Sequence, residues 1–235
     1  MNRLAVIRSV FVLVIGLIAH TAHAGVINVE FDGFSQGRTT VYQTLDGNNM
    51  NALAGMYDMS VISANNVDDW LSEQSEIQAF CVELDQYLTT SGSVEYTVMA
   101  GADFFQDAQT LDKIGRLYTG FFQSVLAQTE DKQKRIYSTA FQLALWDLVY
   151  DAATPNLLED RYQMRADKNG TVRAKANEFL NGLANFENQF SLFVLQSDTS
   201  QDLLIVNPVP PRLVSEPSTL AAFVLMALVF VRRKA

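Results

Sequence analysis

The chain has 235 residues, with 17 basic and 26 acidic side chains, and a net charge of −9 at neutral pH. This length suits one domain with its own core, and the absence of a basic stripe argues against nucleic acid as a partner. Both histidines, His20 and His23, lie in the first 24 residues, so the remainder can hold no Ser-His-Asp triad, Cys-His dyad or histidine metal site.

The first 24 residues have the three-part pattern of a secretory signal peptide. Arg3 and Arg8 form the positive start, residues 10–18 are an apolar run, and residues 22–24 (Ala-His-Ala) fit a small-x-small cleavage site. The alternative is an uncleaved anchor, although the run is shorter than the roughly 20 residues of a typical membrane span. We expect cleavage directly after this site, so that the mature chain begins at Gly25.

The next part of the chain is rich in β-forming residues and turn signals. We predict a turn at Asp32-Gly33 and another at residues 46–49 (Asp-Gly-Asn-Asn). The strand over 78–84 is largely apolar and is expected near the middle of a sheet. Strands are predicted over residues 26–31, 39–45, 78–84 and 94–98.

Beyond these strands, apolar residues recur at helical spacing and then return to strand character. Helices are predicted over residues 109–127, 132–150 and 171–186, and strands over 190–195 and 203–206. The sum predicts a single α+β domain over residues 25–207, an antiparallel β-sheet or sandwich with a helical insert. Residues 208–214, with three prolines, form a stiff spacer. Residues 25–214 carry a net charge of −13, which favours solubility and repels anionic surfaces.

The last 21 residues combine a short motif, an apolar helix and a basic end. Residues 220–231 are an unbroken apolar run that barely crosses a bilayer, and a basic end stays on the cytoplasmic side. The motif consists of Ser215, Glu216 and Pro217, and the basic end consists of Arg232, Arg233 and Lys234.

This tail, residues 215–235, resembles the PEP-CTERM sorting signal of exported Gram-negative proteins. That signal has a Pro-Glu-Pro box, an apolar helix and a basic terminus, and Ser215 stands here in place of the first proline. The resemblance implies export by the secretion machinery, transient residence in the inner membrane, and removal of the tail by an exosortase. The product would reside at the cell surface or in the extracellular matrix. An ordinary C-terminal anchor is the alternative.

Two residues stand out within the predicted core. Cys81 is the only cysteine, so an intramolecular disulfide is impossible. Gln142 is the one carboxamide in the apolar helix segment 140–146, and burying a carboxamide without partners costs roughly 1–3 kcal/mol. The plain interpretation is a small buried thiol and a glutamine bonded to backbone.

The segments Phe80-Cys81-Val82 and 141–146 (Phe-Gln-Leu-Ala-Leu-Trp) resemble the two motifs of thioester domains in bacterial surface adhesins. The resemblance implies that Cys81 and Gln142 form an internal thioester with loss of ammonia, which captures an amine such as a lysine of a partner. This is single-use chemistry, not enzymatic turnover, and it involves no cofactor and no metal. Candidate assisting residues, which the sequence does not place relative to the pair, are Glu83, Asp85, Tyr87 and Trp146.

Two other functions stay open at this stage. The first is a passive structural protein of the extracellular matrix or biofilm, with no reactive bond. The second is an exported hydrolase in which Glu83 and Asp85, on one face of a strand, act as paired carboxylates. Calcium at residues 68–69 or 46–49 is disfavoured because neither stretch has the spacing of an EF-hand loop.

Overall fold

The structure is a computed structural model that describes residues 25–166 and 170–208. Within these residues, every strand pairs with antiparallel neighbours. The described strands are β1 (Gly25–Gly33), β2 (Arg38–Leu45), β3 (Asn48–Gly55), β4 (Tyr57–Asn65), β5 (Glu76–Cys81), β6 (Ser93–Ala100), β7 (Tyr162–Ala166), β8 (Phe190–Gln196) and β9 (Leu203–Pro208). The sheets are antiparallel and most helices lie together between β6 and β8, which confirms the predicted α+β class.

Helices lie mostly between β6 and β8. The longest, α5, is preceded by a π-helical turn, η1, and followed by α6. The described helical segments are α1 (Asp69–Ser72), α2 (Gly101–Phe105), α3 (Ala108–Leu117), η1 (Tyr118–Phe122), α4 (Gln123–Leu126), α5 (Asp131–Asp151), α6 (Thr171–Gly182) and the 3₁₀ turn η2 (Leu183–Asn185).

Six strands form a closed barrel in the order β1-β4-β5-β9-β8-β6, where a single sheet or a sandwich was expected. The barrel closes because β1 pairs with β4 on one side and with β6 on the other. Alternate side chains in parts of these strands are buried, including Ile27, Met59, Tyr96 and Val194. Closure gives each of these six strands a paired neighbour on both sides over at least part of its length.

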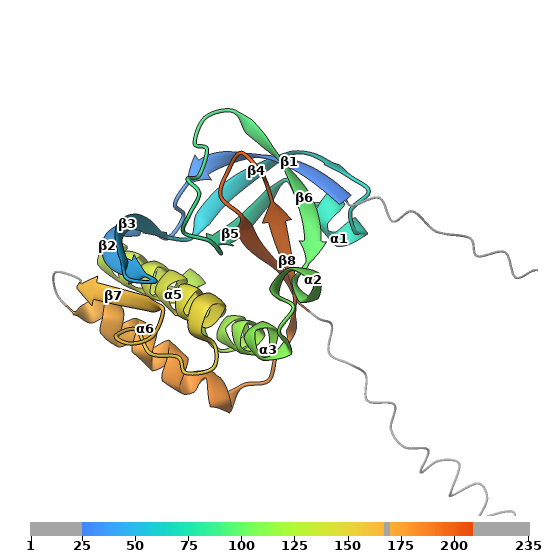
Figure 1. The fold of residues 1–235 in the computed structure, drawn as a ribbon. Helices are drawn as coiled ribbons and strands as arrows, with labels where there is room; N and C mark the ends of the chain where they lie inside the picture. The colour runs from blue at the N-terminus through green and yellow to red at the C-terminus, as the bar shows by residue number, and fades with distance from the viewer. Residues whose placement is uncertain (1–24, 167–169, 209–235) are drawn as a thin grey trace, which may run out of the picture.

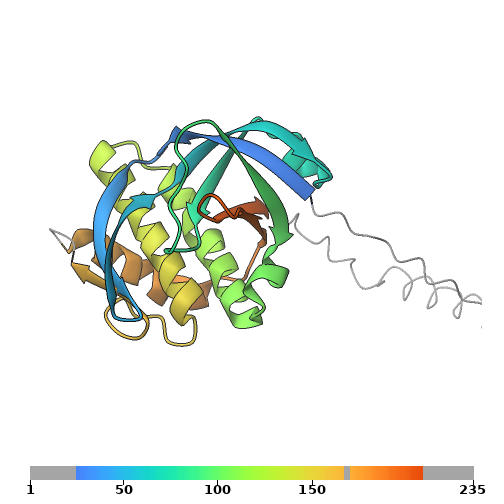
Figure 2. The ribbon, with the colours of Figure 1, turned by 45° about the horizontal axis from the view of Figure 1, so that its top comes forward.

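A second sheet, in the order β3-β2-β7, lies below the barrel with the helices (Figure 1). Figure 2 shows α5 between the strands β2 and β3 on one side and α6 on the other. A helix that packs on several layers must be apolar on nearly every face. Residues 138–148 of α5 are accordingly all buried, and they include Gln142.

Several predicted boundaries were wrong. The strand predicted over 78–84 ends at Cys81, and the helix predicted over 109–127 is divided by η1. Asn48 and Asn49 belong to β3 and not to a turn, and Pro208 ends β9 instead of beginning a spacer. These residues are weak strand formers that pairing with a neighbouring strand holds in place.

The predicted signal peptide and sorting tail lie outside the described residues. This applies to residues 1–24 and to the motif at Ser215, Glu216 and Pro217. It applies equally to the basic end, Arg232 to Lys234, so export and sorting remain predictions. Within residues 25–166 and 170–208, no helix is both long and apolar enough to cross a membrane.

Candidate functional site: Cys81 and Gln142

Cys81 and Gln142 lie 61 residues apart in the chain and meet in the core. The Cys81 main-chain N–H donates to Gln142 Oε1 at 3.0 Å, and Gln142 Nε2 donates to the Cys81 carbonyl oxygen at 2.8 Å. Both residues have no exposed surface. The carboxamide thus meets the requirement that a buried polar group find partners, and its carbon lies against the main chain that bears the sulfur.

The path of β4 explains why the Cys81 main chain is free to receive a side chain. The pairing of β4 with β5 ends where Tyr57 lies opposite Ala79, two residues before Cys81. The chain preceding Tyr57 instead turns to α5, where Met56 N–H donates to Ser138 Oγ at 2.7 Å. The Gln142 carboxamide takes the place of the missing strand, because it offers the same donor and acceptor as a peptide group.

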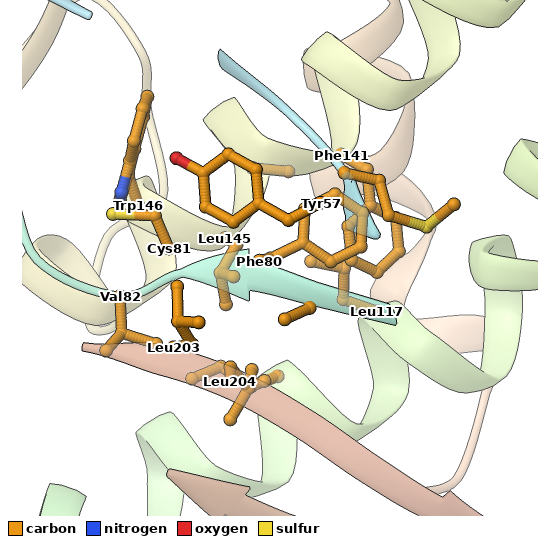
Figure 3. Close-up of a cluster of buried hydrophobic side chains, with 14 of the residues drawn as sticks. Tyr57, Phe80, Cys81, Val82, Leu117, Phe141, Leu145, Trp146, Leu203 and Leu204 are labelled. Carbon is orange, nitrogen blue, oxygen red and sulfur yellow. The ribbon is translucent and has the colours of Figure 1, made fainter. Parts of the chain in front are cut away.

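The sulfur has two polar neighbours. Cys81 Sγ donates to the Glu83 carbonyl oxygen at 2.6 Å, and the indole nitrogen of Trp146 lies beside the sulfur (Figure 3). Burial raises the pKa of the Cys81 thiol far above its ordinary value, whereas Trp146 and the Glu83 backbone lower it by less. The Trp146 N–H contact falls short of a regular hydrogen bond. The resting group is therefore a neutral thiol.

Aromatic rings pack together where the two motif segments meet. Phe80 stacks on Phe141 with ring centroids 4.6 Å apart, and Tyr118 meets Phe141 edge-on at 4.9 Å. All three side chains are almost completely buried. Such surroundings exclude water and strengthen electrostatic interactions.

The three other predicted assisting residues do not share this buried environment. They follow the end of β5, so Glu83 and Asp85 do not lie on a strand. The prediction that these two carboxylates share one face of a strand, as in a hydrolase site, was wrong. Burial, followed by the charges of Asp202 and Asp85, raises the pKa of the half-buried Glu83 to about 7. The Tyr87 side chain is 91% exposed and lies in solvent.

A residue that the sequence did not indicate bonds to the same carbonyl oxygen as the Cys81 sulfur. Gln201, in the turn between β8 and β9, donates from Nε2 to the Glu83 carbonyl oxygen at 3.1 Å and to the Gln86 carbonyl oxygen at 3.2 Å. Its Oε1 accepts from Tyr57 Oη at 3.0 Å. A polar residue in a predicted loop between strands carries no sequence signal of this role. In the described part of the chain, no three Cys, His, Asp or Glu side chains are grouped to hold a metal ion.

Comparison with known proteins finds two solved structures that are similar to this chain. No family model matches the chain, and no curated protein matches it. The thioester domain of the Staphylococcus aureus TIE protein is similar at a TM-score of 0.42 and 11% identity, over 77% of this chain and 78% of that chain. The N-terminal thioester domain of a surface protein from Clostridium perfringens is similar at a TM-score of 0.39 and 15% identity, over 71% of this chain and 98% of that chain. Both structural neighbours are thioester domains of bacterial proteins, and the second is described as belonging to a surface protein.

Proposed function

We propose that the mature chain is an exported binding module of the cell surface or extracellular matrix, and that Cys81 and Gln142 form an internal thioester for covalent capture of amines. The observation that carries this proposal is the pair of hydrogen bonds by which Gln142 holds the Cys81 main chain inside a sealed, apolar core. A buried carboxamide needs partners, but it does not need the only thiol of the chain as its neighbour.

Closure of the bond is an exchange of one leaving group for another. The Cys81 sulfur attacks Gln142 Cδ, the Cδ–Nε2 bond breaks, and the thiol proton leaves with the nitrogen as ammonia. Negative charge develops on Gln142 Oε1, to which the Cys81 N–H already donates, and this donor stabilises the tetrahedral intermediate. Attachment of both groups to a rigid core supplies the effective concentration for closure.

Capture of an amine breaks the thioester bond. An amine attacks the thioester carbonyl, Cys81 leaves with the amine proton as a thiol, and an amide remains at Gln142. The Trp146 N–H beside the sulfur favours the charge that develops on the leaving sulfur. The captured amine stays bound to residue 142 as an amide, so each molecule captures one amine and the protein is not an enzyme in the sense of turnover. The partner would be a lysine or another surface amine.

The test is the intact mass of freshly purified mature protein. We expect the wild type to weigh one ammonia less than its sequence, and Cys81→Ser and Gln142→Met to have their full sequence masses. Both substitutions nearly keep the size of the side chain, which preserves steric fit, and Gln142→Met also removes the two hydrogen bonds to the Cys81 main chain. Methylamine should add to the wild type at residue 142, release a titratable thiol, and leave the buried Gln43 unmodified as an internal control.

A passive structural role is the second candidate, and one observation favours it. The two hydrogen bonds to the Cys81 main chain already satisfy Gln142 and tie α5 to the end of β5. If this were their whole purpose, wild-type protein would retain its full mass and a free thiol. A mass that exceeds the sequence by the difference between a carboxyl and a carboxamide would instead record a thioester that water had hydrolysed.

A further inference from the structure

The segment over Cys81 is held in place by one turn of the chain. Residues 82–92, between β5 and β6, form no helix or strand; we call them the covering segment. Val82 N–H donates to the Asp202 carbonyl oxygen at 3.1 Å, and Thr89 N–H donates to Ser200 Oγ at 3.0 Å. The described polar contacts thus join the covering segment to the turn between β8 and β9.

Gln201 makes the most of these contacts. Its main-chain N–H donates to the Tyr87 carbonyl oxygen at 3.2 Å, and its Nε2 donates to the carbonyl oxygens of Glu83 and Gln86. Tyr57, a buried residue of the barrel, donates to its Oε1 at 3.0 Å. Gln201 therefore joins the rigid barrel to three carbonyl groups of the covering segment.

One of those carbonyl groups also holds the sulfur. The Glu83 oxygen accepts from Cys81 Sγ at 2.6 Å and from Gln201 Nε2 at 3.1 Å. A carbonyl oxygen has two lone pairs, and both are used here. The location of the sulfur therefore depends on the Glu83 carbonyl, which Gln201 helps to hold. The Glu83 side chain is held as well, because its Oε1 accepts from the Asp202 N–H at 2.7 Å.

We propose that Gln201 is a positioning residue for Cys81: it fixes the Glu83 carbonyl that holds the sulfur, and it keeps the covering segment closed over the thiol. Gln201 touches neither reacting atom and is not a catalytic residue. Its effect on thioester closure rests on the function proposed above, whereas its hold on the thiol does not. Loss of the Gln201 side chain should make the thiol easier to reach and slower to close on Gln142.

The first measurement uses a variant that cannot form the thioester. In Gln142→Met no thioester can form, so alkylation of Cys81 by iodoacetamide reports how often the covering segment opens. We expect Gln201→Leu in this background to raise the native-state alkylation rate about tenfold, because two hydrogen bonds that close the segment are lost. Tyr57→Phe should have a smaller effect in the same direction, because it removes only the contact that orients Gln201.

The matched control is Gln43→Leu. Gln43 is fully buried, whereas Gln201 is 8% exposed, and Gln43 likewise accepts from a buried tyrosine, Tyr162, at 2.9 Å, but its bond lies in the second sheet. Urea denaturation corrects both variants for lost stability. An alkylation rate in Gln201→Leu that equals that of Gln43→Leu at equal stability would overturn the proposal. If Gln201→Leu does not fold, Gln201→Glu replaces it. The glutamate keeps the oxygen that accepts from Tyr57 and lacks the side-chain N–H donors, and its alkylation rate is compared with that of Gln43→Leu at equal stability.

The second measurement follows ammonia loss after refolding in chains that retain Gln142. Closure in Gln201→Leu should be about tenfold slower than in the wild type, and closure in Gln43→Leu should be unchanged at equal stability. Equal closure rates in all three chains would contradict a positioning role. A wild type that never loses ammonia would refute the proposed function, and the alkylation rates would still decide whether Gln201 holds the sulfur.

Discussion

At the scale of single residues, the core holds polar groups in two different ways. Gln142 has a partner for each end of its carboxamide. Asp147, five positions further along α5, is fully buried, and neither of its oxygens has a hydrogen-bond partner of regular geometry in the described structure. Burial, followed by the charges of Asp151 and Asp160, raises the pKa of Asp147 to about 7, against weaker lowering by Asn156 and Lys113.

This carboxyl should make the stability of the protein fall as the pH rises. The folded chain binds the Asp147 proton more tightly than the unfolded chain, whose value is 3.8. The contribution of Asp147 is therefore complete below about pH 4 and is lost as the pH rises through about 7. We expect the unfolding free energy to fall less between pH 5 and pH 8 in Asp147→Asn than in the wild type, by at most about 3 kcal/mol, which corresponds to roughly two pK units.

Urea denaturation at the two pH values measures this effect. The unfolding free energy of Asp147→Asn should still fall between the two pH values, because the raised pKa of Glu83 acts in the same direction. We call this fall with pH the slope. Asp103→Asn, at an exposed position of α2, is the matched control and should keep the slope of the wild type. An unchanged slope in Asp147→Asn would show that this carboxyl is ionised in the folded protein.

At the scale of elements, the site depends on where β4 stops pairing with β5. The chain leaves the barrel at Met56, where Ser138 of α5 accepts from its N–H at 2.7 Å and donates to the Gly37 carbonyl oxygen at 3.2 Å. The neighbouring Thr139 donates to the Ala54 carbonyl oxygen at 3.0 Å. These contacts fix α5 against the chain between the second sheet and the barrel, and they place Gln142 one turn further along the helix.

Ser138→Ala should therefore destabilise the fold by about 1–3 kcal/mol, because it leaves the buried N–H of Met56 without a partner. Thermal and urea denaturation measure the loss. The control is Ser124→Ala on α4, whose hydroxyl bonds only to the Phe121 carbonyl of its own helical region among the described contacts. If the two variants lose equal stability, Ser138 does not join α5 to the crossing chain.

At the scale of the whole molecule, the fold separates a barrel from a helical layer with its own small sheet (Figure 1). Cys81 is contributed by the barrel, Gln142 by the helical layer, and Gln201 by the turn between the last two described strands. The candidate site therefore exists only when these parts are assembled. We expect it to be absent from the unfolded chain during export and to form after folding outside the cytoplasm.

Export can be tested on the complete gene product. N-terminal sequencing of the envelope fraction should begin at Gly25, because Ala22 and Ala24 fit the cleavage site. Neutral replacements of Arg232, Arg233 and Lys234 together should weaken retention in the inner membrane, since these charges resist translocation. Retained Met1 would contradict the signal peptide, and unchanged partition and maturation would contradict the sorting tail.

The sequence alone determined the α+β class and most element positions, and it singled out two candidate residues, whose pairing was implied by the resemblance to thioester domains. Strand and helix periods differ, so they can be read locally, and an isolated carboxamide in an apolar helix is conspicuous because its burial needs compensation. These local signals identified Cys81 and Gln142 before any contact between them was known.

Only the tertiary structure decided how those residues meet and what surrounds them. Barrel closure, the end of β5 at Cys81 and the hold of Gln201 on Glu83 depend on pairings between distant segments. No local pattern encodes such pairings, because each is chosen by competition among all strands and helices for partners and burial. The Gln201 contacts are the clearest case: a polar side chain in a turn between strands acquires its role only when the covering segment lies against it.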